Sequence, residues 1–392
     1  MSLLSESYLN ATDAMLSDPT MFLFCSSRIG VKTSGIQEKI SAPAQGCVEK
    51  NSPLMQAVHQ AFDNAKRRGI DNPIVVGAIP FDVSQESQLF VPNDYEFIRK
   101  EDCVMPEGDN RPLSVESSYS EPDEAGFKAA VTNAIELFKQ KKLEKAVLSR
   151  IQTINTNRKI NPDQVQKRLM EQNSGGYHFR LPLQHGETLV GASPELLLRK
   201  EGEYLHSNPL AGSTKRQKNA GLDRSSSFAL LSSDKDRYEH KLVIDAIRQQ
   251  LQPVCSVLHV PDFPTLINTP TMWHLSTDIQ GKLRDPRTTS LQLACLLHPT
   301  PAMCGSPTEV AAQLIADLEP HNRGVFSGMV GWMDSEGNGE WAFVIRSAII
   351  QDKRIRLFAG AGVVEHSNPE SEWAETTAKM ATMLNAFGLA ND

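Results

Sequence analysis

Two glutamates and a lysine recur at helical spacing near the C-terminus of the chain. Glu372, Glu375 and Lys379 lie three and four residues apart, in a segment that opens with the helix-start signal Asn368-Pro369. Two carboxylates one helical turn apart repel each other, and a bound divalent cation would relieve that repulsion. The lysine one turn further on could hold an anion beside the metal. The same spacing is also typical of a solvent-exposed helix face with an ordinary Glu–Lys pair, so these residues alone leave both interpretations open.

Three other charged residues occur in segments of β-strand composition. Lys145 begins the strand-like segment 145–151, and Glu195 lies where Gly and Pro residues interrupt the segment 188–199. Burial would raise the pKa of Glu195, which a general acid at neutral pH requires. Arg346 stands in an apolar strand-like segment, where a guanidinium needs an anionic partner, either structural or a ligand carboxylate. For Lys145 and Glu195, a solvated position on an edge strand is the competing interpretation.

A charge-dense segment from Arg224 to Gln252 predicts one long helix, which carries the candidate metal ligand Glu239. His274 follows a tryptophan in an apolar stretch and is more typical of a hydrogen-bonded core residue than of a catalyst. The six cysteines contain no CxxC pair, and neither His274 nor His298 has the HExxH spacing of zinc proteases. If the carboxylates converge, their hard oxygen ligands favour Mg²⁺ over zinc.

Apolar runs separated by turn residues predict the elements that would position these side chains. We expect strands at Met21–Cys25, Pro73–Phe81, 145–151, 188–199, Phe326–Met333, Trp341–Ile350 and Arg356–Val364, the last running into a glycine turn. We expect helices at Leu54–Arg68, 127–138, 224–252 and 369–387, a turn at Asn208–Thr214, a hairpin turn at Ser335–Gly339 and an exposed connection at Met105–Asp123. The core face of the C-terminal helix is expected to hold Trp373, Thr377, Met380, Leu384 and Phe387.

The bulk composition is that of a soluble globular protein with a sizeable core. The chain has 392 residues, of which 40% are hydrophobic and 22% are charged. A net charge of −7 argues against a broad nucleic-acid surface. The N-terminus lacks a signal-peptide pattern, and no apolar run approaches the roughly 20 residues of a membrane helix. We therefore expect a cytoplasmic protein with no nucleic-acid or membrane partner.

A set of collinear motifs extends over about residues 120–390. The motifs are KAVLSR (145–150), GASPELLLRK (191–200), PLAGS (209–213), DRYEHKLV (236–243), HPTPA (298–302), IRSA (345–348), FAGAGVV (358–364) and SEWAETTAK (371–379). Together they resemble the chorismate-utilising enzymes. The segment NPIVVGAIPFD (72–82) is similar to the isochorismate synthases of catecholate (2,3-dihydroxybenzoate) siderophore pathways. The resemblance implies one α/β domain over 1–392, a two-sheet, mostly antiparallel β-sandwich with helices outside, which includes the less motif-rich residues 1–104.

The resemblance also implies an activity, the Mg²⁺-dependent isomerisation of chorismate to isochorismate. It assigns Lys145 as the base that activates water for attack at C2, and Glu195 as the acid that protonates the departing C4 hydroxyl. Mg²⁺ would be held by Glu239 and Glu375, with Glu372 assisting through water. Substrate contacts are expected from Gly212, Ser213, His274, Met303, Phe326, Arg346, Gly360 and Lys379.

Single positions within this family separate its reactions. Ammonia-using members usually have Gln at the position of Lys145, and aminodeoxychorismate synthases carry a nucleophilic Lys at the position of Ala211. Both positions therefore favour water as the nucleophile, and we expect a monomer with no glutamine amidotransferase subunit. Three alternatives stay open: a salicylate synthase, which goes on to eliminate pyruvate, an isochorismate synthase of the menaquinone branch, and a non-catalytic scaffold for pathway enzymes. Met303 and Phe326 are among the pocket residues that bear on the first alternative.

Overall fold

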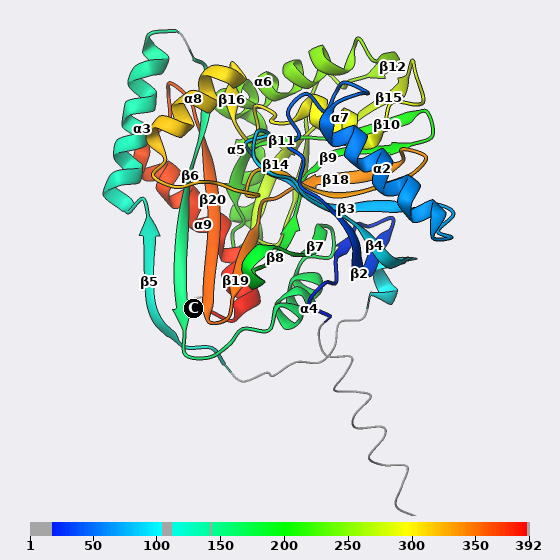
Figure 1. The fold of residues 1–392 in the computed structure, drawn as a ribbon. Coiled ribbons are helices and arrows are strands. Elements are labelled where there is room, and N and C mark those ends of the chain that lie inside the picture. The colour runs from blue at the N-terminus through cyan, green and yellow to red at the C-terminus, as the bar shows by residue number, and fades with distance from the viewer. Residues whose placement is uncertain (1–17, 104–111, 142, 390–392) are drawn as a thin grey trace, which may run out of the picture.

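The computed structural model describes residues 18–103, 112–141 and 143–389 of the chain (Figure 1). Within these residues every strand pairing is antiparallel. Hydrogen bonds join the strands into a 17-stranded sheet and a separate three-stranded sheet. The expected α/β class with mostly antiparallel strands is thus confirmed, and the layers of the large sheet are parts of one continuous ladder.

The large sheet can be followed from strand to strand through its pairings. In spatial order it contains β12 (Cys255–His259), β15 (Ile279–Leu283), β10 (Tyr204–Asn208), β9 (Leu196–Glu201), β18 (Gly339–Phe343), β17 (Met329–Asp334), β3 (Ile74–Ile79), β4 (Gln88–Ile98), β2 (Gly30–Ile40), β1 (Leu23–Cys25), β7 (Tyr177–Pro182), β8 (Thr188–Ser193), β19 (Ser347–Gln351), β20 (Arg354–Val363) and β6 (Lys145–Thr156), whose outer edge carries β5 (Val115–Glu121) and β16 (Gly305–Ser306). The small sheet contains β11 (Leu210–Lys215), β14 (Met272–Ser276) and β13 (Thr265–Asn268). Strands from the N-terminal hundred residues therefore pair directly with strands from the motif-bearing part.

The ladder contains two strand interruptions that lie beside each other. β8 and β9 are separated only by Pro194 and Glu195, and β18 and β19 only by 344–346. β8 pairs with β19 and β9 pairs with β18, so the two breaks lie side by side. Across them, Phe343 N donates to the Glu195 carbonyl (3.3 Å) and Ala192 N donates to the Arg346 carbonyl (3.1 Å). Arg346 has a φ of 50°, a backbone strain that lifts it out of both strands. Our expectation of one continuous strand through Arg346 is wrong for this reason.

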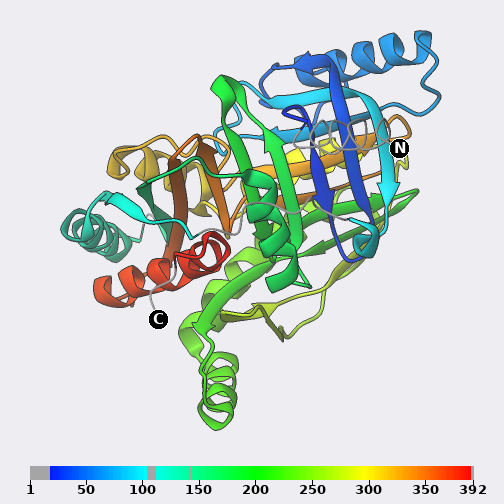
Figure 2. The same cartoon turned by 90° about the horizontal axis from the view of Figure 1, so that it is seen from below.

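Helices cover the outside of the sheet. They are α2 (Pro53–Arg67), α3 (Glu124–Lys139), α4 (Pro162–Gln172), α5 (Ala220–Ser232), α6 (Asp234–Leu251), α7 (Ser290–Leu297), α8 (Thr308–Leu318) and α9 (Pro369–Phe387). Figure 2 shows α3 and α9 on one flank of the ladder and α2 on the opposite flank. Among the described residues, no helix has both the length and the apolar character needed to cross a bilayer.

Several local expectations are corrected by the structure. The segment 224–252 forms two helices because Ser233 caps α6, its side chain accepting a hydrogen bond from Asp236 N. The expected turn at 208–214 is mostly strand β11, and β20 continues through its glycines. The exposed connection contains strand β5, while its residues 105–111 lie outside the described part of the chain.

The C-terminal helix is capped as expected but rotated from the expected orientation. Asn368 accepts hydrogen bonds from the first turn, and Gly388 ends the helix with a φ of 70°. Met380 and Phe387 are buried as predicted, whereas Thr377 is exposed and Glu372 is buried. Apolar spacing misled here because buried polar residues occupy part of the inward face.

Candidate active site

One cavity collects the sequence-predicted site residues from elements far apart in the chain. It is lined by all of them except Glu372, that is by Lys145, Glu195, Gly212, Ser213, Glu239, His274, Met303, Phe326, Arg346, Gly360, Glu375 and Lys379. Strands β6 and β20 form one wall and the paired strand breaks another, while β11, β14, α6 and α9 close the remaining sides. Residues that we did not predict complete the lining: Val147, Pro194, Leu210, Ala302, Ser327, Ile345, Phe358, Ala359 and Gly362, together with Ala211.

Lys145 and Glu239 form a buried ion pair inside this cavity. Lys145 is the first residue of β6 and its side chain is 1% exposed; its Nζ lies 2.9 Å from Glu239 Oε1 on α6. Gly362 on the neighbouring β20 makes room for the pair, since a Cβ there would lie 2.4 Å from Glu239 Oε1 and 3.2 Å from Lys145 Cε. The glycine-rich motif 358–364 was the only signal of this requirement, and it does not indicate which glycine faces the carboxylate.

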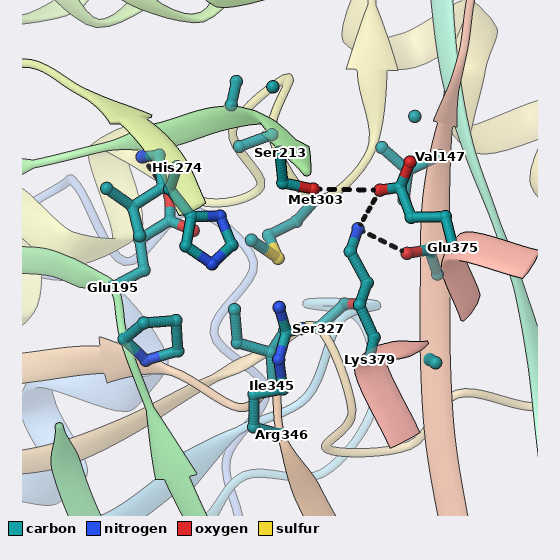
Figure 3. Close-up of a pocket in the computed structure, with 18 of the residues that line it drawn as sticks. Val147, Glu195, Ser213, His274, Met303, Ser327, Ile345, Arg346, Glu375 and Lys379 are labelled. Atoms are coloured by element: carbon teal, nitrogen blue, oxygen red, sulfur yellow. Dashed lines mark hydrogen bonds and ion pairs between the residues drawn. The ribbon is translucent and has the colours of Figure 1, made fainter. Parts of the chain in front are cut away.

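Glu195 and His274 face the cavity together on the opposite side from Glu375 and Lys379 (Figure 3). Glu195 Oε1 accepts a hydrogen bond from Leu210 N (3.1 Å), and burial raises the pKa of this carboxyl to about 8. His274 is buried, its Nε2 has no hydrogen-bond partner in the part of the chain that the structure describes, and burial lowers the pKa of the imidazole well below the usual range. The site thus holds a carboxyl that keeps its proton at neutral pH beside a neutral imidazole.

Arg346 supplies a buried cation from the strand break. Its guanidinium points into the cavity between the side with Glu195 and His274 and the side with Glu375 and Lys379 (Figure 3). Burial lowers the pKa of Arg346 to about 10, and no carboxylate among the described residues lies within ion-pair distance of it. Because a buried charge without a partner is costly, the arrangement favours an anionic ligand at this position.

The carboxylates of α9 are each held by a lysine. Glu375 Oε1 lies 2.6 Å from Lys379 Nζ and accepts a hydrogen bond from Ser213 Oγ (3.3 Å), while Lys379 Nζ also donates to the Gly360 carbonyl (2.9 Å; Figure 3). Burial acts to raise the pKa of Glu375, but Lys379, Lys235 and the hydrogen bond from Ser213 together outweigh it and the net pKa is lowered. Glu372 lies behind the cavity wall with its Oε1 3.1 Å from Lys235 Nζ.

The donor set fits a hard divalent cation. Burial, followed by the charge of Glu375, raises the pKa of Glu372 to about 7, and its buried Oε2 has no hydrogen-bond partner among the described residues. Such crowding of carboxylates is what a cation would relieve. In the described part of the chain no three acidic, histidine or cysteine side chains already form a metal-binding cluster. Mg²⁺ needs only one or two carboxylates when waters and substrate supply its other ligands.

Comparisons with known proteins agree with the motifs. The model of the chorismate binding enzyme family matches residues 58–388, so the chain belongs to that family. Isochorismate synthase EntC of Escherichia coli (strain K12) is 46% identical over 374 residues, covering 95% of each chain, and isochorismate synthase DhbC of Bacillus subtilis (strain 168) is 40% identical over 378 residues, covering 95% of this chain and 94% of the relative. A Bacillus anthracis structure assigned as 2,3-dihydroxybenzoate-specific isochorismate synthase DhbC superimposes with a TM-score of 0.88 at 38% identity, covering 97% of this chain and 100% of the other. The resemblance inferred from the motifs is confirmed.

Proposed function

We propose that this protein is an isochorismate synthase, which converts chorismate to isochorismate for a 2,3-dihydroxybenzoate siderophore pathway. The observation that carries the proposal is the meeting of Lys145, a protonated Glu195 and an unpaired Arg346 in one cavity. A base, an acid and a cation for a carboxylate are what this isomerisation of a dicarboxylate requires. The names of the relatives support the same reaction.

The proton transfers follow from the placement of the two candidate groups. Lys145, released from Glu239, would act as the base that takes a proton from a water that attacks C2 of the ring. Glu195 gives its proton to the C4 hydroxyl, which leaves as water while the ring double bonds shift. The reaction consumes one water and releases another, so the free enzyme is regenerated once a proton passes back from Lys145 to Glu195. A carboxyl with a pKa of about 8 is suited to this donation at neutral pH.

The remaining residues bind and orient the substrate. Arg346 would form a bidentate pair with the enolpyruvyl carboxylate, assisted by Lys379 and the backbone at Gly360. Gly212 and Ser213 would contact the ring end, and the neutral His274 would shape the pocket without adding charge. Met303 and Phe326 would supply apolar walls, the second stacked on Phe358 with ring centroids 5.2 Å apart.

Glu239 and Glu375, with Glu372 through a water, are the residues that would hold Mg²⁺. When bound, the cation would draw electrons from the ring diene through the ring carboxylate. The side chains themselves then orient the substrate and the attacking water. This orientation contributes much of the rate enhancement in a reaction whose overall charge changes little.

Water instead of ammonia is the proposed nucleophile, because Lys145 and Ala211 both line the cavity. Because ammonia is not the nucleophile, we infer that the protein acts without an amidotransferase subunit. We also infer that it is a cytoplasmic monomer and that residues 1–392 act as one catalytic domain.

The test is chromatography of the products after pure protein is incubated with chorismate, with and without Mg²⁺, and with ammonium in a separate sample. Isochorismate in equilibrium with chorismate, formed only with Mg²⁺, is the expected result. Salicylate with pyruvate would identify a salicylate synthase, and an amino product would contradict the roles of Lys145 and Ala211. No turnover in any sample would favour a scaffold. The siderophore branch is tested separately by rescue of iron-limited growth in cells that lack their own isochorismate synthases, whereas rescue of menaquinone synthesis alone would assign the other branch.

A further inference from the structure

A buried arginine joins the strand of Lys145 to the helix of Glu372 and Glu375. Arg150 lies on β6 and is 3% exposed. Its Nε donates to Thr376 Oγ1 (2.9 Å) and its Nη2 donates to Thr377 Oγ1 (2.9 Å), both on α9. Its third hydrogen bond runs the other way, from Nη1 to Ser120 Oγ on β5 (3.1 Å).

The guanidinium of Arg150 is also stacked on α9. Its Cζ lies 3.8 Å from the ring centroid of Trp373, and the Trp373 ring also packs against Phe127 of α3, with ring centroids 5.8 Å apart. Three consecutive contacts to one helix, two hydrogen bonds and a cation–π contact, restrain both its rotation and its distance from the strand.

This cation has no carboxylate partner within ion-pair distance among the residues that the structure describes. Burial lowers the pKa of Arg150 to about 10, an effect that the charge of Glu124 offsets only in part, and the groups in direct contact with the guanidinium are hydroxyls and a ring. A purely structural contact at this position could be made more cheaply by apolar side chains. The directional contacts of the guanidinium therefore indicate that Arg150 has a role beyond packing.

The residues that Arg150 holds are interleaved with the site residues of α9. Trp373 directly follows Glu372, and Thr376 directly follows Glu375. Because one residue corresponds to about 100° of helix rotation, a small turn of α9 would swing Glu375 away from the cavity and would shift Glu372 behind the cavity wall. The same turn would pull Lys379 off the Gly360 carbonyl.

We propose that Arg150 is a positioning residue that sets the rotation of α9 against β6, and thereby aligns Glu372, Glu375 and Lys379 with Lys145. The inference rests on the proposed function, since these are the residues assigned to the cation and the substrate. It predicts that the hydrogen bonds of Arg150 toward α9 matter for cation affinity, and that its bond toward β5 does not.

The chain offers a matched pair of variants for this test. Thr376→Val with Thr377→Val removes the two acceptors on α9 while keeping the β-branched shape, and Ser120→Ala removes the acceptor on β5. In wild type and both variants, the Kd for Mg²⁺ is measured by calorimetry, alongside the Mg²⁺ concentration for half-maximal activity and the midpoint of thermal unfolding. We expect the double variant to bind Mg²⁺ about tenfold more weakly, and Ser120→Ala to stay within about twofold of wild type.

Arg150→Lys adds a second check, because lysine keeps the charge but has no planar fork for two threonines and a ring. We expect it to behave like the double variant. Equal Mg²⁺ affinity in all four proteins, or equal weakening by the β5 and α9 variants, would refute the positioning role and leave a merely structural one. A wild-type protein that makes no isochorismate would instead overturn the proposed function, and this inference with it.

Discussion

Substitution of Gly362 by alanine is expected to abolish most activity while leaving the fold intact. The added Cβ would lie 2.4 Å from Glu239 Oε1 and 3.0 Å from its Cδ, whereas ordinary contacts begin near 3.4 Å. The carboxylate must therefore move by about 1 Å, which displaces one of the residues proposed to hold Mg²⁺. The clashing atom is the end of a flexible side chain, so folding can accommodate the change cheaply.

A misplacement of about 1 Å at a catalytic group costs roughly 100-fold in rate, or about 2.7 kcal/mol of transition-state stabilisation. The loss should appear in kcat/KM at saturating Mg²⁺, with the thermal midpoint little changed, since Gly→Ala also reduces the entropy of the unfolded chain. Gly175→Ala is the control, because a Cβ at that position meets nothing within 4 Å. Activity of the Gly362 variant within about threefold of wild type would refute the reasoning.

Three further substitutions test the individual roles. Lys145→Ala should lower kcat by about 10²- to 10⁴-fold, and full turnover would overturn the assigned base. For Glu195, kcat should fall as pH rises through about 8, because the acid loses its proton, and Glu195→Gln should be nearly inactive. The raised pKa of Glu195 also means that the folded protein loses stability as pH rises from 4.5 to about 8, a slope in unfolding titrations that the Gln variant should lack. Arg346→Met should raise KM for chorismate by about 10- to 100-fold while the thermal midpoint holds or rises, since a buried charge without a partner is removed; a large fall in the midpoint would show a structural ion pair.

Local chemistry made much of the fold predictable. The start of α9 at Asn368-Pro369 and its end at Gly388 follow from hydrogen bonds and backbone angles within a few residues. The interruption of 188–199 by Gly and Pro residues marked the break between β8 and β9 that contains the buried Glu195. The break at Arg346 had no such signal, because no Gly or Pro interrupts the segment 341–350, and the break is visible only in the pairing of its two halves with β9 and β8.

The sequence by itself determined the residue types of the site and, through the collinear motifs, the family to which they belong. Their side chains differ from their apolar neighbours, and that contrast is visible without coordinates. Only the tertiary structure decided which groups meet. It paired Lys145 with Glu239, left Arg346 without a carboxylate at ion-pair distance within the described residues, turned Glu372 inward and placed Gly362 against the Glu239 carboxylate. These are distances between elements separated by dozens or hundreds of residues, and they depend on how the ladder bends and how α9 is rotated, which no local spacing specifies.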